Sequence, residues 1–172
     1  MDKNISTKVE NIRVYVNDND LVGTADVTLP DVEFITDTVK GAGVLGEIEV
    51  VSTQFKAMAV KLSFSSISEA VAKLRAPGEH ELDLRGVVKD FDSATGQYID
   101  TGRKYIIRGS HKKSTGGKFA PGEKMGNELE FTVTYYKEVI DGTVTAEIDL
   151  LNFKLIIDGT DYLAAQRQIL GV

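Results

Sequence analysis

The chain has 172 residues, a net charge of −6 and a hydrophobic fraction of 42%. This size suits one domain with a substantial core, so we expect a single domain over residues 1–172. The acidic balance disfavours a dedicated nucleic-acid-binding protein, and the absence of cysteine excludes disulfides, thiolate zinc sites and cysteine nucleophiles. No apolar run approaches the roughly 20 residues that span a bilayer, and the N-terminus lacks the apolar centre of a signal peptide. We therefore expect a protein made in the cytosol, without membrane anchoring.

Alternating apolar residues predict two strands near the N-terminus, at Ile12–Val16 and Ala25–Leu29, joined near residues 18–20. The next stretch is polar, and six residues rich in glycine, Gly41–Gly46, follow it before the strand signal resumes. We therefore expect a long glycine-containing loop over residues 37–50. Loops of this length inside a compact domain are uncommon and are often functional.

The middle of the chain combines strands with one short helix. Apolar residues at every second position from Met58 to Phe64 indicate a half-buried strand. Ser68 is a suitable N-cap for a helix over Glu69–Arg75, because its side chain offers an acceptor to the first turn. Two further strands are expected at Glu81–Phe91 and Tyr98–Gly109, followed by a loop rich in glycine, proline and lysine at residues 114–126.

The last forty residues predict a hairpin and a terminal helix. Thr134–Ile140 and Thr143–Ile157 are rich in β-branched and aromatic residues, and Asp141-Gly142 between them favours a two-residue turn. Residues 160–170 are expected to form the helix. The whole pattern predicts a mainly β fold, an antiparallel β-sandwich or half-barrel with one short internal helix and a C-terminal helix.

The predicted turn fixes which residues of this hairpin share a face, because side chains alternate along a strand. The face expected in the core holds Leu129, Phe131, Val133, Tyr135, Val139, Val144, Ile148 and Leu150. The opposite face holds Glu130, Thr132, Thr134, Tyr136, Glu138, Thr145, Glu147 and Asp149. Burying unpaired carboxylates would cost several kcal/mol, so we expect the second face to be exposed and to tolerate a joint Glu147→Lys and Asp149→Lys replacement.

No arrangement of residues indicates an enzyme, a metal site or a cofactor site. Gly41, Gly43 and Gly46 satisfy the spacing of a dinucleotide-binding loop, but the strand before it and the helix after it are missing from the pattern. The two histidines, His80 and His111, stand in no metal-binding or nucleophile-activating spacing. We therefore expect no catalytic residue, no metal and no cofactor.

Basic residues gather between Arg103 and Lys124. One interpretation is a solvated strand and loop balanced by acidic neighbours. A second is phosphate binding, which is disfavoured because only Tyr105 and Phe119 offer aromatic surfaces for stacking. A third is electrostatic complementarity with the acidic first hundred residues of another copy.

Several motifs resemble, in the same order, the major tail tube proteins of contractile phage tails and phage-tail-like contractile bacteriocins. They are Leu29-Pro30, Lys40-Gly41-Ala42-Gly43, Arg108-Gly109-Ser110-His111-Lys112, Pro121-Gly122-Glu123-Lys124, Thr134-Tyr135-Tyr136-Lys137, Glu147-Ile148-Asp149 with Asn152, Asp158-Gly159, and Arg167 with Leu170-Gly171. The resemblance spans nearly the whole chain. It implies a structural protein of a virion tail or phage-tail-like particle, assembled in the bacterial host cytoplasm.

In that family, six subunits join into a closed β-barrel ring, and the rings stack into a hollow tube inside a contractile sheath. The resemblance implies the sheath, baseplate and tail terminator proteins as partners, with transient passage of DNA. On this basis we expect a subunit interface at Lys40, Gly41, Gly43, Gly46, Arg108, His111, Lys112 and Lys113. We expect Thr132, Thr134, Glu147 and Asp149 to face the channel. A small-ligand-binding β-barrel protein is the alternative.

Overall fold

A computed structural model describes residues 4–17, 20–41, 43 and 45–171. The fold is mainly β, and the strands are β1 (Asn4–Val16), β2 (Asp20–Gly23), β3 (Asp26–Thr28), β4 (Phe34–Lys40), β5 (Glu47–Phe55), β6 (Met58–Phe64), β7 (Glu79–Asp92), β8 (Gln97–Thr115), β9 (Asn127–Ile140), β10 (Thr143–Asp149), β11 (Lys154–Ile157) and β12 (Thr160–Asp161). The helices are α1 (Glu69–Lys73) and α2 (Ala164–Leu170). The predicted fold class is confirmed.

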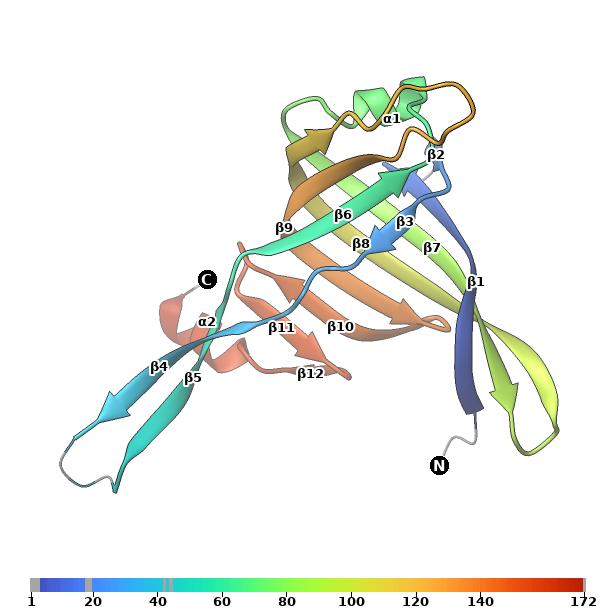
Figure 1. Cartoon of the computed structure of the whole chain (residues 1–172). Coiled ribbons are helices and arrows are strands. Elements are labelled where there is room, and N and C mark those ends of the chain that lie inside the picture. The colour runs from blue at the N-terminus through green and yellow to red at the C-terminus, as the bar shows by residue number, and fades with distance from the viewer. Residues whose placement is uncertain (1–3, 18–19, 42, 44, 172) are drawn as a thin grey trace.

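One antiparallel sheet makes up most of the molecule, in the order β12-β11-β10-β9-β8-β7-β1-β2. Strand β6 pairs with β9, and β3 pairs with β6, so the sheet continues from β9 in a second direction. Figure 1 shows the result as a strongly curved half-barrel, with β3 and β6 lying across the upper part of β7 and β8. Strands β4 and β5 form a separate two-stranded sheet that projects from this body as an arm.

Strand β9 branches the sheet at a bulge. Residues 127–133 pair with β6, whereas residues 135–140 pair with β10 along the same edge. On the other edge, Arg108 lies opposite Tyr135 and Gly109 lies opposite Val133, so no residue of β8 lies opposite Thr134. A Cβ atom at Gly109 would lie 1.7 Å from the carbonyl oxygen of Thr132, so only glycine fits.

The bulge reverses which side chains of β9 enter the core. Leu129, Phe131 and Val133 are buried as predicted, but the next core side chain is Tyr136, with Tyr135 on the opposite face. The predictions for these two tyrosines were therefore wrong, and so were those for Glu138 and Val139 farther along the same strand. An extra residue in a strand shifts the alternation by one position, and the sequence around Thr134 carries no signal of it.

The core lies between the curved sheet and the β3–β6 layer. Val60, Leu62, Ile107, Leu129 and Phe131 are among its fully buried members. Helix α1 covers one end of the half-barrel (Figure 1), with Val71 and Leu74 buried. Its N-cap is Ser68, whose Oγ accepts a hydrogen bond from Val71 N at 3.2 Å, as predicted.

The loop expected over residues 37–50 is instead the two-stranded arm. Phe34–Lys40 pairs with Glu47–Phe55, and the rings of Phe34 and Phe55 pack 4.8 Å apart at its base. Neither face of β4 is buried, so the apolar alternation by which a strand is recognised is absent from its sequence. Ala42 and Val44 of the predicted turn lie outside the described residues.

The C-terminal hairpin is confirmed in register, since Ile140 lies opposite Thr143 across the Asp141-Gly142 turn. Both turn residues have positive φ angles, 47° and 80°. The strand expected over Thr143–Ile157 is divided into β10 and β11 by a turn at residues 150–153. Asp158-Gly159 forms a second tight turn into β12, so the terminal helix begins at Ala164 and not at residue 160.

Other strands are longer than expected. β1 begins at Asn4, and β8 continues to Thr115, so the predicted loop at 114–126 begins at Gly116. An additional strand, β2, precedes β3 and pairs with the end of β1. Asp18 and Asn19 of the predicted first turn lie outside the described residues.

Candidate assembly surfaces

The arm is the most exposed element of the structure. The side chains of Val39, Ile48, Val50 and Val51 are each about half exposed or more, and Leu45 near the tip is fully exposed. A hydrogen bond of 3.2 Å from Gln166 Nε2 to Thr53 Oγ1 connects its base to α2. A two-stranded sheet with apolar side chains open to water is marginally stable alone, so this surface suits contact with another protein.

The first group of predicted interface residues, Lys40, Gly41, Gly43 and Gly46, lies at the end of the arm. Lys40 Nζ is 2.5 Å from Glu47 Oε1 across the two strands, and both side chains are more than half exposed. The three glycines have positive φ angles and open space around them. They connect two strands, and no helix follows them, so the arrangement that holds a dinucleotide phosphate is absent at this position.

The second group, Arg108, His111, Lys112 and Lys113, lies on β8 in the main sheet, so the structure does not bring the two groups together within one subunit. Lys112 Nζ is 2.8 Å from Glu130 Oε1, and His111 packs edge-on against Phe131 with ring centroids 5.6 Å apart. Lys113 stands opposite Glu130 in the register.

The basic run is largely balanced by nearby carboxylates, on a neighbouring strand or within the same loop. Lys104 Nζ lies 3.2 Å from Asp83, and Lys118 Nζ lies 2.6 Å from Glu123. Asp83 is buried and also pairs with Arg85. Of the three interpretations of this run, the structure favours the strand balanced by acidic neighbours.

Among the residues predicted to face the channel, Asp149 differs most from expectation. It is only 9% exposed. Its carboxylate accepts hydrogen bonds from the backbone N–H groups of Leu151 and Asn152 at 3.1 and 3.0 Å, and from Asn152 Nδ2 at 2.7 Å. Burial opposes ionisation of Asp149, but these donors outweigh it and place its pKa below the ordinary value. Asp149 therefore holds the turn that divides β10 from β11.

Glu147 is also engaged within the subunit. Its Oε1 accepts hydrogen bonds from Lys154 Nζ at 2.8 Å and from the Tyr135 hydroxyl at 3.3 Å. Burial raises the pKa of Glu147, but the hydrogen bond and the charge of Lys154 lower it by more, so the pKa is below its ordinary value. Thr132 alone of the four predicted channel residues is exposed, with Thr134 intermediate at the bulge.

The face that contains these carboxylates is mixed in charge and not acidic. A row of directly paired residues crosses five strands, in the order Glu81, Arg108, Tyr135, Asp149 and Lys154. Arg108 lies over the Tyr135 ring, 4.1 Å from its centroid, and its Nε is 3.4 Å from Glu81. The alternation of sign stabilises the sheet laterally and leaves little uncompensated charge on this face.

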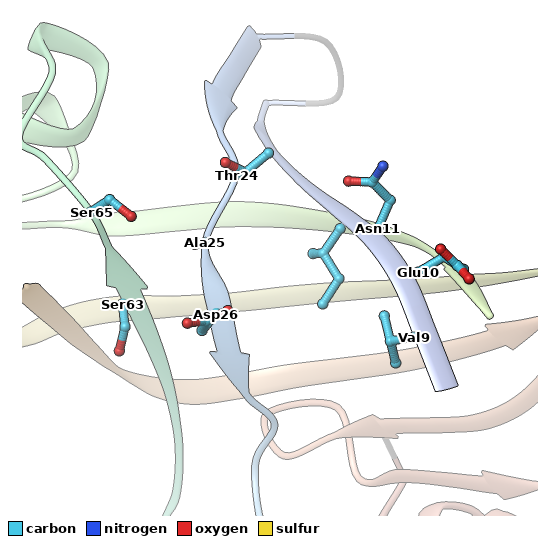
Figure 2. Close-up of a pocket in the computed structure, with 9 residues that line it drawn as sticks. Val9, Glu10, Asn11, Thr24, Ala25, Asp26, Ser63 and Ser65 are labelled. Atoms are coloured by element: carbon cyan, nitrogen blue, oxygen red, sulfur yellow. The ribbon is translucent and has the colours of Figure 1, made fainter. Parts of the chain in front are cut away.

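A gap separates β1 from β3, because the half-barrel does not close there. Figure 2 shows its outer side, with Val9, Glu10 and Asn11 on β1 and Thr24, Ala25 and Asp26 on the facing segment. Ser63 on β6 and Ser65 just after its end complete the lining. Beyond Val14–Val16, where β2 pairs with it, β1 has no strand on this edge within the described residues. We name this gap, between residues 9–12 and 24–28, the seam.

The remaining chemistry is sparse. Within the described ranges, no group of three or more histidine or acidic residues is placed to hold a metal ion. His80 and His111 both pack edge-on against the ring of Phe131, and His80 Nε2 lies 2.9 Å from the carbonyl oxygen of Ala76. None of the described helices is long and apolar enough to cross a membrane.

Comparison with known proteins identifies the family. The sequence profile of phage tail tube protein FII matches residues 6–171. The chain belongs to this family. The tail tube protein of Escherichia phage P2 is 24% identical over 169 residues, which cover 96% of this chain and 97% of the phage protein.

A solved structure agrees in fold. The chain is similar to a protein in the sheath/tube terminator of an extracellular contractile injection system, PVC, in its extended state. The TM-score is 0.53 at 11% identity, over 79% of this chain and 96% of the other. The predicted resemblance is confirmed: this tail tube protein is a structural component of a virion tail, and a small-ligand-binding barrel is not favoured.

Proposed function

We propose that six copies of this tail tube protein close into a ring and that the rings stack into the hollow inner tube of a contractile tail. Family membership over residues 6–171 is the observation that carries this proposal. The half-barrel supports it, because the outer strands β2, β3 and β12 each pair on one side only among the described strands. Unpaired edges are templates for pairing with another chain, and closure into a ring removes them.

The contractile sheath surrounds this tube, and baseplate and tail terminator proteins contact its two ends. The tube is assembled in the host cytoplasm. It passes DNA without specific binding in a phage, or breaches an envelope in a bacteriocin. We infer a mechanical role for this protein, and not a catalytic one.

Sedimentation across a concentration series, followed by electron microscopy of the densest fraction, tests the assembly. We expect six-membered rings and stacked tubes at high protein concentration. A strictly monomeric, compact species at millimolar concentration would contradict the proposal.

The arm is the proposed contact to another copy, with Lys40, Gly41, Gly43 and Gly46 at its tip. Because the arm forms its own sheet, replacing residues 37–46 by a short turn should leave circular dichroism and melting of the body unchanged. The yield of tubes should collapse. Arg108, His111, Lys112 and Lys113 are proposed as a second, weaker part of the interface, since their charges are already partly compensated.

The channel wall is proposed to be the face of the main sheet that carries Thr132, Thr134, Glu147 and Asp149. Thr132 is the informative position because it is exposed and Asp149 is not. Thr132→Lys tubes should retain duplex DNA at low salt and release it as salt rises, whereas Thr132→Ser tubes should not retain it. A map that placed Thr132 on the outer wall would contradict this orientation.

A further inference from the structure

The seam between β1 and β3 has two sides of different chemistry. Its outer side is polar and carries two carboxylates, Glu10 and Asp26 (Figure 2). Glu10 is already paired with Lys8 at 3.1 Å and Lys89 at 3.8 Å, whereas Asp26 forms no ion pair within the described residues. Its inner side is an apolar cavity of about 170 Å³ lined mainly by Val9, Ile12, Val27, Leu29, Leu84 and Val88. Val9 and Ile12 line both sides, so the two hollows flank one unpaired stretch of β1.

The inner cavity is also lined by a buried hydrogen-bond donor that has no partner within the described residues. Arg103 lines it, and Arg103 Nη1 is buried without a hydrogen-bond partner. In the part of the chain that the structure describes, no carboxylate lies within ion-pair distance of this guanidinium. The acidic group that its charge reaches is Asp90, whose pKa is lowered chiefly by a hydrogen bond from Thr101 and to a smaller extent by Arg103. A buried donor without an acceptor is costly, so an occupant that supplies a carboxylate beside an apolar side chain would be favoured.

The cavity has the size of one side chain. An apolar cavity of about 150 Å³ accommodates benzene, so this one accommodates a valine or a somewhat larger side chain. The free edge of β1 offers backbone hydrogen bonds beside it. An extended segment that pairs with β1 would direct alternate side chains into the apolar cavity and toward the polar outer side.

We propose that the seam of one subunit binds strand β4 of the arm of a second copy, with Val39 in the apolar cavity and Asp37 on Arg103. Asp37 and Val39 are two residues apart, so both point to the same side of the strand, roughly 7 Å apart. Thr36, Thr38 and Lys40 point to the other side, where Lys40 faces the carboxylates of the outer hollow. Asp37 forms no ion pair with any residue that the structure describes.

The arm of the same subunit does not fill the seam, because it projects from the body at a distance from β1 (Figure 1). Strand β4 pairs with β5 along one edge, and its other edge is open among the described strands. Strand β5 fits less well. Its alternation would direct Glu47 and Glu49 at the carboxylates of the outer hollow when Ile48 and Val50 enter the cavity.

Disulfide formation between two variants tests the contact, since the chain has no cysteine of its own. Val39→Cys protein is mixed with Val9→Cys or Ile12→Cys protein, concentrated and oxidised. Paired strands bring cysteines within the 4.4–6.8 Å Cα separation that a disulfide needs, so we expect a covalent dimer with at least one of the two. Thr38→Cys protein, whose cysteine is on the opposite side of β4, should give about tenfold less covalent dimer. No dimer with Val39→Cys, an equal yield with Thr38→Cys, or a higher yield with Ile48→Cys would overturn the assignment.

Charge reversal gives an independent test. Arg103→Glu and Asp37→Arg should each raise the protein concentration needed for tubes about tenfold or more, and the two changes in one chain should restore it. Each variant is first shown to melt as the parent does. A double variant as defective as either single one would overturn the pairing.

This inference rests on the proposed function only in taking the second copy as the partner, and the two fail separately. Tubes that form without the Val39 disulfide would overturn the seam contact alone. Disulfide-linked dimers without rings would support the seam and contradict the tube.

Discussion

Replacing Asp149 by alanine should destabilise the folded subunit by about 2–3 kcal/mol. The carboxylate is 9% exposed and accepts three hydrogen bonds, from Leu151 N, Asn152 N and Asn152 Nδ2. Hydrogen bonds to a charged group contribute about 1.5–3 kcal/mol when the partners stay buried. Residues 151 and 152 are exposed, so water can accept hydrogen bonds from their N–H groups once the carboxylate is removed. The loss of stability is therefore well below the sum of three hydrogen-bond energies.

Two further variants at this position separate charge from hydrogen bonding. Asp149→Asn keeps an acceptor for the backbone donors and should lose about 1 kcal/mol. Asp149→Lys should lose more stability than Asp149→Ala. Lys154 lies directly opposite position 149 on β11, and Arg108 is two strands away on the other side in the same row, so the new lysine would stand between two cations. This reverses the expectation, based on sequence, that lysine here leaves folding nearly unchanged.

Urea unfolding at low protein concentration measures these changes by far-ultraviolet circular dichroism, because the chain has no tryptophan. A chain of this size loses about 2–4 °C in melting temperature per kcal/mol, so the alanine variant should melt roughly 4–12 °C lower. Glu49→Ala, on the exposed arm, is the control and should change stability by less than about 0.5 kcal/mol. An alanine variant at Asp149 within that same range would refute the role assigned to this carboxylate.

Three other predictions concern the same fold. Gly109→Ala should cost about 3 kcal/mol or more, or prevent folding, because its Cβ would overlap the Thr132 carbonyl, whereas Gly102→Ala, with no atom within 4 Å, should melt as the parent does. Ser68→Ala should cost about 1 kcal/mol in urea unfolding by removing the N-cap of α1, and Ser68→Asp should recover it. The lowered pKa values of Asp149 and Glu147 predict that their contribution to the free energy of unfolding is complete above about pH 5 and is lost as the pH falls through the folded pKa values. Asp149→Asn should flatten this dependence of stability on pH. An Asp149→Asn protein with the same acid unfolding profile as the parent would contradict the prediction.

Local patterns predicted the elements whose signal lies in consecutive residues. The Asp141-Gly142 turn, the Ser68 cap and the buried alternation from Met58 to Phe64 are all present. Each of these features depends on a few neighbouring positions in the sequence, and local interactions stabilise it. Family membership, likewise, was available from ordered motifs along the chain.

What the sequence did not indicate depends on pairing between distant segments. Strand β4 has no buried face, so only its partner β5 makes it a strand. The bulge at Thr134 exists because β9 must leave β6 and join β10, and it moves Tyr136 into the core. Asp149 was predicted to be exposed because Thr143–Ile157 reads as one continuous strand. The turn that interrupts this run donates the hydrogen bonds that the Asp149 carboxylate accepts.

An assembly protein of this kind must keep its edges open for a partner and still avoid indiscriminate pairing before assembly. The described edges show how both requirements are met. Strands β3 and β12 are short, three and two residues, and β1 is irregular, with register shifts at Ser6/Lys8 and Val9/Asn11. Short and bulged edges pair poorly with arbitrary strands. A segment that also fills the cavity behind β1 and pairs with Arg103 gains binding free energy that an arbitrary strand does not gain. Selectivity at the seam therefore follows from side chains and not from the backbone edge alone.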